Sequence, residues 1–310
     1  MGTYLTKPNK HKKTQTGENG KVAFGSSEMQ GWRVSMEDSK IINLCLDEST
    51  MIFGVFDGHG GCEVSKFVGR HFGYNLLNNP LYEANKLEEA LISTFMKMDE
   101  LLNTEESMKE LIRISKGLSA SHPIKKPTLN TGVGCTALVT LIRDSELFVA
   151  NAGDCRCVLN RGGIAIDLSQ DHKPVLKAEK NRIINAGGAI FEGRINRGLN
   201  LSRAIGDFSY KSNHNLPPNQ QMVIAEPEIC RIKLQENDQF LIMACDGVWE
   251  RLKSQDAVDF VAMRIRDMPL GKISEEILEY CIAPKVTNGL GCDNMTLIIV
   301  KFKCSDKVIV

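Results

Sequence analysis

Five short apolar runs, rich in β-branched residues, constrain the fold of this chain more than any other feature. Each is bounded by turn residues and is typical of a buried strand; they cover residues 51–56, 135–142, 146–150, 239–245 and 295–302. Helical periodicity is clearest at residues 62–77, 86–115, 174–186, 255–266 and 273–282. Strands occur in clusters and helices in pairs, without strict alternation. This order predicts antiparallel sheets covered by helices rather than a doubly wound parallel sheet.

Composition along the chain predicts one folded domain at residues 22–304, preceded by a short arm and followed by a short tail. Residues 1–21 are polar and basic, so we expect an extended arm there, and residues 305–310 form a short tail. A Gly-, Asn- and Pro-rich stretch at about residues 187–225 has weak periodicity. Such stretches are typical of functional surface flaps or mobile loops.

Net charge and cysteine spacing argue against several classes of protein. The formal net charge is zero, whereas a dedicated nucleic-acid binder carries a basic stripe. The ten cysteines form no CxxC pair, and the sequence shows neither a signal peptide nor an apolar run near the roughly 18 residues of a membrane span. We therefore expect reduced thiols that act as small buried hydrophobic residues, in a cytosolic or nuclear protein. The patterns GxxxxGK[ST], HExxH and GxSxG are absent from the sequence.

Acidic residues stand at the ends of several expected strands. Six acids occupy such positions: Glu37, Asp38, Asp57, Asp154, Asp246 and Asp293. Asp57 and Asp246 each follow a strongly apolar run and precede a glycine. A single acid at a strand end is usually a solvated turn residue. Strands that share a sheet bring their ends together, however, so these acids are candidates for one cluster.

Carboxylates that converge need a cation. Two carboxylates about 4 Å apart, at an effective dielectric constant near 20, repel each other by roughly 4 kcal/mol. Either some are protonated or a cation lies among them. Oxygen donors suit Mg²⁺ or Mn²⁺, whereas zinc prefers nitrogen and sulfur. Gly58 has no Cβ, so its carbonyl can also approach an ion, and the pattern predicts a site for a hard divalent cation.

Arg33 and His59 each have an ordinary and a functional interpretation. Arg33 and Glu37 lie four residues apart on an expected extended segment and face the same side. The arginine is either a surface ion-pair partner or, beside a metal, a bidentate phosphate ligand. His59 is either a turn histidine without a task or a general acid. Asp207, in LSRAIGDF, is either a further ligand or a helix-cap acid.

Taken in order, a series of segments resembles the metal-dependent protein phosphatases of type 2C, the PPM family. The matching segments are SSEMQGWRVSMEDS, FGVFDGHGG, GCTALV, NAGDCRCVL, LSQDHKP, EKNRIINAGG, LNLSRAIGDFSYK, EPEI, FLIMACDGVWE and GCDNMTLIIV. They extend over about residues 20–302. The resemblance implies an α+β fold, a four-layer α-β-β-α sandwich with two central antiparallel sheets. It also implies a protein serine/threonine phosphatase that hydrolyses phosphoserine and phosphothreonine with water activated by two Mn²⁺ or Mg²⁺ ions.

The resemblance carries metal-binding roles over to the acids after the strands. Asp57 matches the ligand that bridges both ions, and the Gly58 carbonyl completes the protein ligands of the first ion. Asp246 and Asp293 match ligands of the second ion.

Further roles follow from the same resemblance. Glu37 and Asp38 match acids that contact the ions directly or through water. Arg33 matches the arginine that binds the phosphate, and His59 matches the proposed general acid.

Asp154 matches an acid associated with a weaker third ion. Position 250 is Glu where many relatives carry Asp as a partner of that ion. The longer Glu250 side chain is expected to disturb a third site. The chain also stops shortly after the last expected strand, so we expect no regulation by a helical C-terminal extension.

Two other classes of function compete with this interpretation. A phosphatase fold that only binds partners requires the loss of metal ligands, and each main ligand is present. The neutral net charge argues against a metal-dependent nuclease. Only a panel of substrates can distinguish a small-molecule phosphatase from a protein phosphatase. The expected partners are phosphorylated protein substrates and not nucleic acid, and the expected state is a monomer.

The amino terminus MGTYLTKPNKHKK fits a lipidation pattern. Gly2 and Thr6 match M-G-x-x-x-[ST] for N-myristoylation; a chance match on a basic tail is the alternative. One myristoyl chain binds membranes only marginally, with a constant of about 10⁴ M⁻¹. Nearby lysines add at most about 1 kcal/mol each at an anionic surface, and the candidates are Lys7, Lys10, Lys12 and Lys13. We expect partial, salt-sensitive membrane association with most of the protein in solution.

Overall fold

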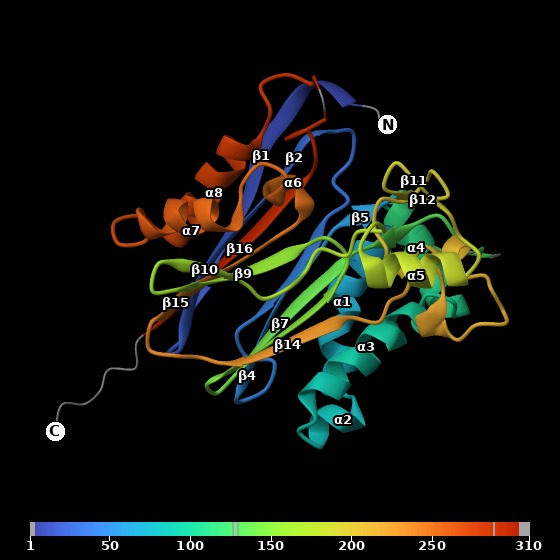
Figure 1. The fold of residues 1–310 in the computed structure, drawn as a ribbon, viewed down its shortest axis with the longest axis horizontal. Helices are drawn as coiled ribbons and strands as arrows, with labels where there is room; N and C mark the ends of the chain where they lie inside the picture. Colours follow the sequence, from blue (N-terminus) through green and yellow to red (C-terminus); the bar gives the residue numbers. More distant parts are fainter. Residues whose placement is uncertain (1–3, 126, 129, 288, 304–310) are drawn as a thin grey trace.

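The computed structural model describes residues 4–125, 127–128, 130–287 and 289–303 (Figure 1). The strands are β1 (Tyr4–Glu18), β2 (Val22–Arg33), β3 (Ser39–Asn43), β4 (Thr50–Phe56), β5 (Gly58–His59), β6 (Gly134–Cys135), β7 (Ala137–Arg143), β8 (Glu146–Ala152), β9 (Arg156–Arg161), β10 (Ile164–Asp167), β11 (Ile190–Phe191), β12 (Arg194–Ile195), β13 (Ile205–Gly206), β14 (Glu228–Lys233), β15 (Asp238–Ala244) and β16 (Met295–Phe302). The helices are α1 (Glu63–Leu77), α2 (Pro80–Glu83), α3 (Leu87–Leu101), α4 (Glu105–Lys116), α5 (Lys177–Asn185), α6 (Asp246–Trp249), α7 (Ser254–Ala262) and α8 (Leu270–Cys281), with 3₁₀ turns η1 (Phe208–Tyr210) and η2 (Pro218–Gln220). Gly2 and the tail at 305–310 lie outside the described residues. Among the helices described, none has the length and apolar character needed to cross a membrane.

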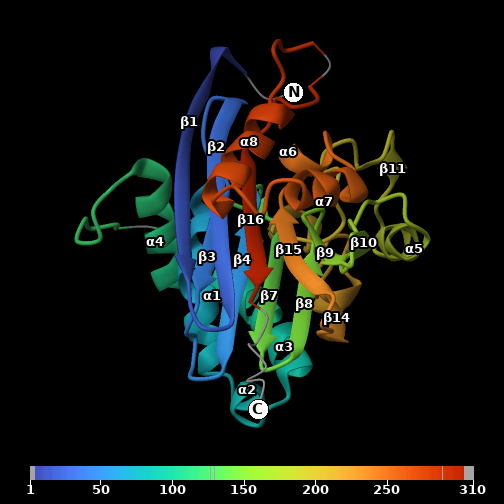
Figure 2. The same ribbon diagram turned by 90° about the vertical axis from the view of Figure 1, so that its left-hand side faces the viewer.

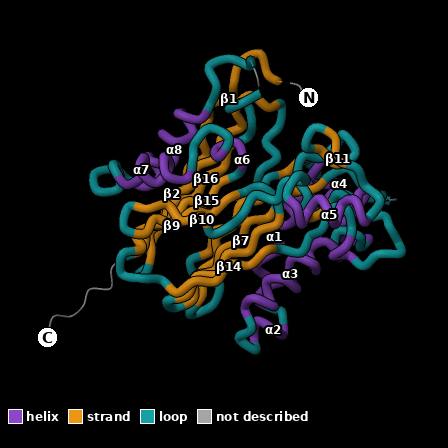
Figure 3. Tube along the Cα trace, viewed as in Figure 1, coloured by secondary structure: helices purple, strands orange, loops and turns teal. Residues whose placement is uncertain are grey.

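Two antiparallel sheets form the centre of the molecule (Figure 3). One has six strands in the order β1-β2-β16-β15-β9-β10, and the other has five in the order β14-β8-β7-β4-β3. An apolar cluster that includes Phe53, Leu138, Leu241 and Ile298 joins the two sheets. All of β4 is buried, which explains the uninterrupted apolar run at 51–56. Burying each large apolar side chain contributes about 1.5–3 kcal/mol relative to leaving it exposed.

Helices cover the outer faces of both sheets (Figure 1). α1 and α3 pack beside the five-stranded sheet around Phe56, Phe72 and Phe95. The rings of Phe72 and Phe95 meet edge to face, with their centroids 5.2 Å apart. α7 and α8 cover the six-stranded sheet over a second cluster that includes Val258 and Ile277. The predicted α+β fold, a four-layer α-β-β-α sandwich, is confirmed.

The periodicity at residues 86–115 corresponds to two helices rather than one. α3 ends at Leu101 and α4 begins at Glu105. Thr104 caps α4, because its hydroxyl accepts a hydrogen bond from the backbone N–H of Ser107 at 3.3 Å. The sequence patterns also do not predict β10 and β14, which are short and partly polar. These strands form by pairing with β9 and β8, so their structure depends on a distant partner.

Within the basic arm expected at residues 1–21, Tyr4–Glu18 are extended, but they are part of the domain. Tyr4–Glu18 form β1, the edge strand of the six-stranded sheet, paired with β2 (Figure 2). Lys10 and Lys12 both form ion pairs with Glu279 of α8, at Nζ–O distances of 2.7 and 2.9 Å. The boundary at residues 21 and 22 therefore does not separate an arm from the domain, because strand pairing and these ion pairs hold the arm in place.

The stretch at residues 187–225 forms a packed substructure with few regular elements. Its small apolar core consists of Ile195, Leu201, Ala204 and Val223 together with Ile183 of α5. Glu179 of α5 ties the helix to this stretch. Its carboxylate accepts hydrogen bonds from the guanidinium of Arg203 at 2.8 Å and from the hydroxyl of Ser202 at 2.6 Å. A role for this segment as a flap stays a prediction.

Candidate active site

The acids at the strand ends meet at one end of the sandwich. β4 delivers Asp57 from the five-stranded sheet, Asp246 follows β15 of the six-stranded sheet, and Asp293 precedes β16. Because β15 pairs with both β9 and β16, the strand ends that carry Asp154, Asp246 and Asp293 lie close together. These three acids line a pocket of about 510 Å³ together with Asp57 and Glu37.

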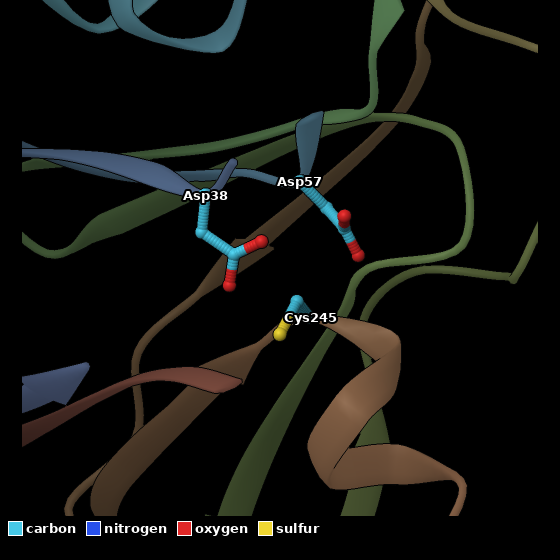
Figure 4. Close-up of side chains that lie close together, drawn as sticks. All are labelled: Asp38, Asp57 and Cys245. Atoms are coloured by element: carbon cyan, nitrogen blue, oxygen red, sulfur yellow. The ribbon is translucent and has the colours of Figure 1, made fainter. Parts of the chain in front are cut away.

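Asp38 is buried beside Asp57 (Figure 4). Candidate ligand atoms of Asp38, Asp57 and Cys245 all lie within 4.8 Å of one another. Oδ2 of Asp38 accepts a hydrogen bond from the hydroxyl of Thr296 at 2.7 Å. Its buried Oδ1 has no hydrogen-bond partner among the described residues. A buried acceptor without a partner is costly, so this oxygen is available to a cation.

The clustered acids raise one another's pKa values. The pKa of Asp38 is raised to about 7, mainly by burial. The hydrogen bond from Thr296 lowers this pKa, whereas the charge of Asp293 raises it. Burial, followed by the charges of Asp38 and Asp246, raises the pKa of Asp57 well above its ordinary value. Burial and the charges of neighbouring carboxylates also raise the pKa of Asp246. A divalent cation relieves such repulsion, so this donor set of oxygens fits Mg²⁺ or Mn²⁺.

Cys245 brings a sulfur atom next to the acids. It lies between β15 and α6 and is fully buried. Its Sγ accepts a hydrogen bond from the backbone N–H of Thr296 at 3.2 Å. Burial, followed by the charge of Asp38, raises the pKa of the thiol well above its ordinary value. A protonated thiol is a poor ligand for Mg²⁺ or Mn²⁺, which leaves the carboxylate oxygens as the donors.

Gly58 and Glu37 pack against each other beside the acids. A Cβ at Gly58 would lie 2.3 Å from the backbone oxygen of Glu37, so only glycine fits there. Glu37 accepts hydrogen bonds from the hydroxyl of Ser35 at 2.7 Å and from the backbone N–H of Gly61 at 3.2 Å. The segment from Arg33 to Glu37 is not one extended strand, because β2 ends at Arg33. The side chains of Arg33 and Glu37 nevertheless both line the pocket.

Arg33 faces the pocket with its guanidinium paired to one acid of the cluster. Nη2 donates a hydrogen bond to Oδ2 of Asp293 at 2.6 Å. Burial lowers the pKa of Arg33, but the charge and hydrogen bond of Asp293 and smaller contributions from other groups together outweigh burial, so the pKa is raised and the group stays charged. The side chain is 40% exposed. Its planar fork can therefore reach an anion in the pocket and bind two oxygens at once.

His59 forms an ion pair that links two distant segments. Its Nε2 lies 2.6 Å from Oδ2 of Asp207, which is 2% exposed. Burial alone lowers the pKa of the imidazole, but the charge and hydrogen bond of Asp207 outweigh burial and raise it. The Asp207 side chain makes no capping hydrogen bond to η1. Asp207 is therefore the partner of His59, and the helix-cap interpretation is wrong.

Asp154 is buried and forms an ion pair with Lys173. The backbone N–H of His172 donates to the carbonyl of Gly153 at 2.9 Å, and the Gly153 N–H donates to Nδ1 of His172 at 3.2 Å, which holds Lys173 near Asp154. Burial lowers the pKa of Lys173, but Asp154 outweighs it and the pKa is raised. Glu250 follows α6 and has a raised pKa because of burial and a neighbouring carboxylate. A third cation at Asp154 and Glu250 would compete with the ammonium of Lys173.

Comparison with known proteins identifies the family. The family model described as Protein phosphatase 2C matches residues 22–290. The chain is 42% identical over 330 residues to probable protein phosphatase 2C 21 of Arabidopsis thaliana, a match that covers 98% of this chain and 93% of that protein. This chain belongs to the protein phosphatase 2C family. It is also 46% identical over 309 residues to probable protein phosphatase 2C 4 of Paramecium tetraurelia, covering 98% of this chain and 99% of that one.

Solved structures share the fold of this protein phosphatase 2C chain. A crystal structure of a phosphatase from a pathogenic strain of Toxoplasma gondii matches with a TM-score of 0.72 and 22% identity, covering 94% of this chain and 96% of that one. A serine-threonine phosphatase 2C from Toxoplasma gondii matches with a TM-score of 0.73 and 18% identity, covering 97% and 98%. At these identities the likeness shows the fold alone.

The structure brings nearly all of the predicted site residues of this protein phosphatase 2C chain into one pocket. Its lining includes Arg33, Glu37, Asp57, Gly58, His59, Asp154, Asp246 and Asp293. Asp38 is buried next to them, whereas Glu250 is not part of the lining. The roles of these residues as ligands, phosphate anchor and acid stay predictions.

Three residues of the site have no role predicted from the sequence: Lys173, Cys245 and Tyr4. The sequence predicts Asp207 as a ligand or a cap, and not as the partner of His59. Asp207 and Lys173 lie within the quoted segments LNLSRAIGDFSYK and LSQDHKP, but their spacing gives no sign of their partners. Cys245 has the pattern of an ordinary core cysteine. Tyr4 lies in the basic arm, yet it lines the pocket.

Proposed function

We propose that this chain hydrolyses phosphoserine and phosphothreonine in proteins by direct attack of water, with two Mn²⁺ or Mg²⁺ ions at the acid cluster. As a member of the protein phosphatase 2C family, it is a metal-dependent protein serine/threonine phosphatase. The observation that carries the detailed proposal is one pocket that combines the acid cluster with Arg33 and His59. This combination supplies a cation site, an anion anchor and a proton donor.

The proposed metal donors are oxygen atoms that converge from both sheets. They are the carboxylates of Glu37, Asp38, Asp57, Asp246 and Asp293 and the carbonyl of Gly58. Oδ1 of Asp38, which has no hydrogen-bond partner among the described residues, and the raised pKa values of the acids support this donor set. When bound, the ions supply positive charge that lowers the pKa of water towards neutrality and draws charge from the phosphoryl group. A third, weaker ion at Asp154 and Glu250 has to displace Lys173.

Arg33 binds the phosphoryl group of the substrate. Its guanidinium fork matches two non-bridging phosphoryl oxygens. The hydrogen bond to Asp293 keeps the guanidinium at the edge of the acid cluster. A phosphoryl group held beside the acids therefore meets the arginine without a large movement of the side chain, and this orientation lowers the entropy cost of reaching the transition state.

His59 supplies the proton that the leaving group needs. Hydrolysis forms a bond from the water oxygen to phosphorus and breaks the bond from phosphorus to the serine or threonine oxygen. That oxygen would leave as a strongly basic alkoxide, so the imidazolium of His59 protonates it and takes up a new proton from solvent. General acid catalysis of this kind typically contributes about 10²–10⁴-fold. Asp207 stabilises the charged ring.

Phosphate release from a phosphothreonine peptide tests the proposal. We expect that protein treated with a chelator releases no phosphate and that Mn²⁺ restores release, while titration calorimetry detects binding of Mn²⁺ to the chelated protein. Undiminished release after chelation contradicts the metal requirement. Release from nitrophenyl phosphate but not from the peptide identifies a small-molecule phosphatase instead.

We also propose that the protein is a monomer of the cytoplasm or nucleus. The described cysteines are free thiols, which suits a reducing compartment. The edge strand β1 carries several lysines, and edge lysines oppose pairing between the sheets of two molecules. Light scattering after gel filtration should give one chain mass, and fractionation should place the protein in these compartments. A dimer mass or recovery in a secretory fraction contradicts the proposal.

Lipidation of Gly2 would give the protein a weak association with membranes. The pairing of Lys10 and Lys12 with Glu279 neutralises part of the basic charge that would attract anionic lipids. We therefore propose association that is partial and sensitive to salt. Co-expression with an N-myristoyltransferase should add the mass of a myristoyl group to the wild type and not to Gly2→Ala. An unmodified wild-type terminus in intact-mass spectrometry contradicts the proposal.

A further inference from the structure

The N-terminal strand reaches the active-site pocket. Tyr4, the first described residue of β1, pairs with Arg33, the last residue of β2. Two irregularities interrupt the pairing between Lys12 and Tyr4, so this stretch of β1 lies along the shorter Met29–Arg33 stretch of β2. Extra residues in one strand bend it and redirect its side chains. These irregularities place Tyr4 across from the residue proposed to bind phosphate.

Tyr4 is held in place on two sides. It is half-buried and packs against the apolar cluster between α8 and the six-stranded sheet. It also lines the active-site pocket together with Arg33. A Cβ at Gly289 would lie 3.7 Å from the Tyr4 hydroxyl oxygen, so the ring reaches the loop that leads to Asp293. Tyr4 thus lies near both members of the Arg33–Asp293 ion pair.

Arg33 has few contacts of its own that fix its orientation. Its one hydrogen bond to a side chain runs from Nη2 to Asp293 at 2.6 Å, within the part of the chain that the structure describes. Its Nε is buried and has no hydrogen-bond partner there. Bidentate phosphate binding requires a fixed orientation of the planar fork. A tyrosine ring is suited to supply that constraint, because it offers a large rigid surface with only two side-chain torsions.

We propose that Tyr4 is a positioning residue for substrate binding, whose ring forms the wall that keeps Arg33 directed at the phosphoryl group. The inference rests on the proposed function of Arg33. It makes the N-terminal strand a part of the active site. The effect belongs to the ring, because the hydroxyl makes no hydrogen bond to the residues described.

Kinetics of three variants on a phosphothreonine peptide at saturating Mn²⁺ test the inference. Tyr4→Ala should raise KM about tenfold, with kcat within about twofold of the wild type, because orientation of the bound phosphate is lost in the ground state and transition state alike. Tyr4→Phe keeps the ring and should match the wild type. Leu5→Ala is the matched control: Leu5 is the next residue on β1, is half-buried and does not line the pocket. It should match the wild type as well.

The Arg33→Ala background separates positioning from direct contact with substrate. If Tyr4 acts through Arg33, adding Tyr4→Ala to Arg33→Ala should not raise KM further. A further increase of about tenfold in that background would show that Tyr4 acts independently of Arg33 and overturn the inference. Equal impairment in Tyr4→Phe, which assigns the effect to the hydroxyl, overturns it too. So does an equal increase of KM in Leu5→Ala, which assigns the effect to displacement of the strand.

Inhibition by inorganic phosphate provides a second measurement that does not depend on the leaving group. Tyr4→Ala should weaken this inhibition by about the same factor as it raises KM, and unchanged inhibition overturns the inference. If Tyr4→Ala fails to fold, Tyr4→Leu keeps an apolar side chain and should still raise KM. Failure of the proposed function is distinguishable, because the wild type itself then releases no phosphate with Mn²⁺.

Discussion

Replacing Asp207 with asparagine tests how His59 is kept protonated. Asparagine keeps the size of the side chain but removes the charge that faces Nε2 at 2.6 Å. Hydrogen bonds to charged groups contribute about 1.5–3 kcal/mol, and each 1.4 kcal/mol changes an equilibrium about tenfold. The His59 side chain is only 25% exposed, so water screens the pair weakly. At pH values at which His59 is mostly deprotonated, we expect the protonated fraction of His59 to be about 10- to 150-fold lower in Asp207→Asn than in the wild type.

The sign of the pH dependence follows from the direction of the pKa shift. Asp207 raises the pKa of His59, so the imidazolium persists to higher pH in the wild type than in the variant. For a phosphothreonine peptide, kcat should fall with rising pH in both proteins, and the fall should begin at lower pH in Asp207→Asn. At mildly acidic pH the two proteins should differ little, whereas at mildly alkaline pH the variant should lose most of its activity.

The assay compares two substrates across this pH range at saturating Mn²⁺. Nitrophenyl phosphate has a leaving group that hardly needs a proton, so its hydrolysis should be much less affected by Asp207→Asn. Asp238→Asn serves as the matched control, because Asp238 is a buried acid paired with Arg161 at 2.7 Å at the other end of β15. Its pH profile should equal that of the wild type. Equal losses on both substrates at every pH would refute the acid role and indicate that Asp207 only holds its loop.

Three further outcomes are expected. Asp57→Asn and Asp246→Asn should each lower turnover by more than about a hundredfold without lowering the melting temperature, because each removes a charge from a repulsive cluster; activity retained with Mn²⁺ bound contradicts the two-ion site. Glu250→Asp should lower the Mn²⁺ concentration for half-maximal activation about threefold, and an unchanged titration shows that position 250 does not contact a cation. Burial raises the pKa of Glu179, but hydrogen bonds and charges of Arg182 and Arg203 outweigh burial and lower the pKa to about 2. The charge of Glu179 therefore stabilises the fold at neutral pH. This contribution is lost as the pH falls from the unfolded-state pKa of about 4.5 towards 2. Glu179→Gln should therefore cost about 3 kcal/mol of unfolding free energy at neutral pH, with a smaller difference in acid; an equal cost at both pH values in urea titrations contradicts the charge argument.

Local patterns predicted the elements whose information lies within a few residues. The run at 295–302 has the same bounds as β16, and the run at 51–56 differs from β4 by one residue at its start. Both strands are largely buried, so apolar character alone marks them. The run at 86–115 shows the limit of periodicity: apolar spacing continues across a turn whose position depends on the cap at Thr104.

Chemistry at the strand ends could also be predicted from the sequence. An acid and a glycine after a buried strand locate Asp57 and Asp246, because a strand that is rigid and buried delivers the next residue to a fixed place. Their convergence was expected from the general rule that strands of one sheet share an edge. The structure adds that the acids come from two sheets packed face to face, which brings Asp38 next to Cys245.

The sequence by itself determined the layered α+β class, the acids available for a metal site and the candidate roles of Arg33 and His59. Only the tertiary structure decided which partners these residues have. Asp207 meets His59 across 148 positions of the chain, and Tyr4 faces Arg33 because two irregularities shift the register of β1. Periodicity and turn chemistry are encoded by neighbouring residues, whereas such contacts depend on how distant strands pair and how the two sheets pack, which no local pattern specifies.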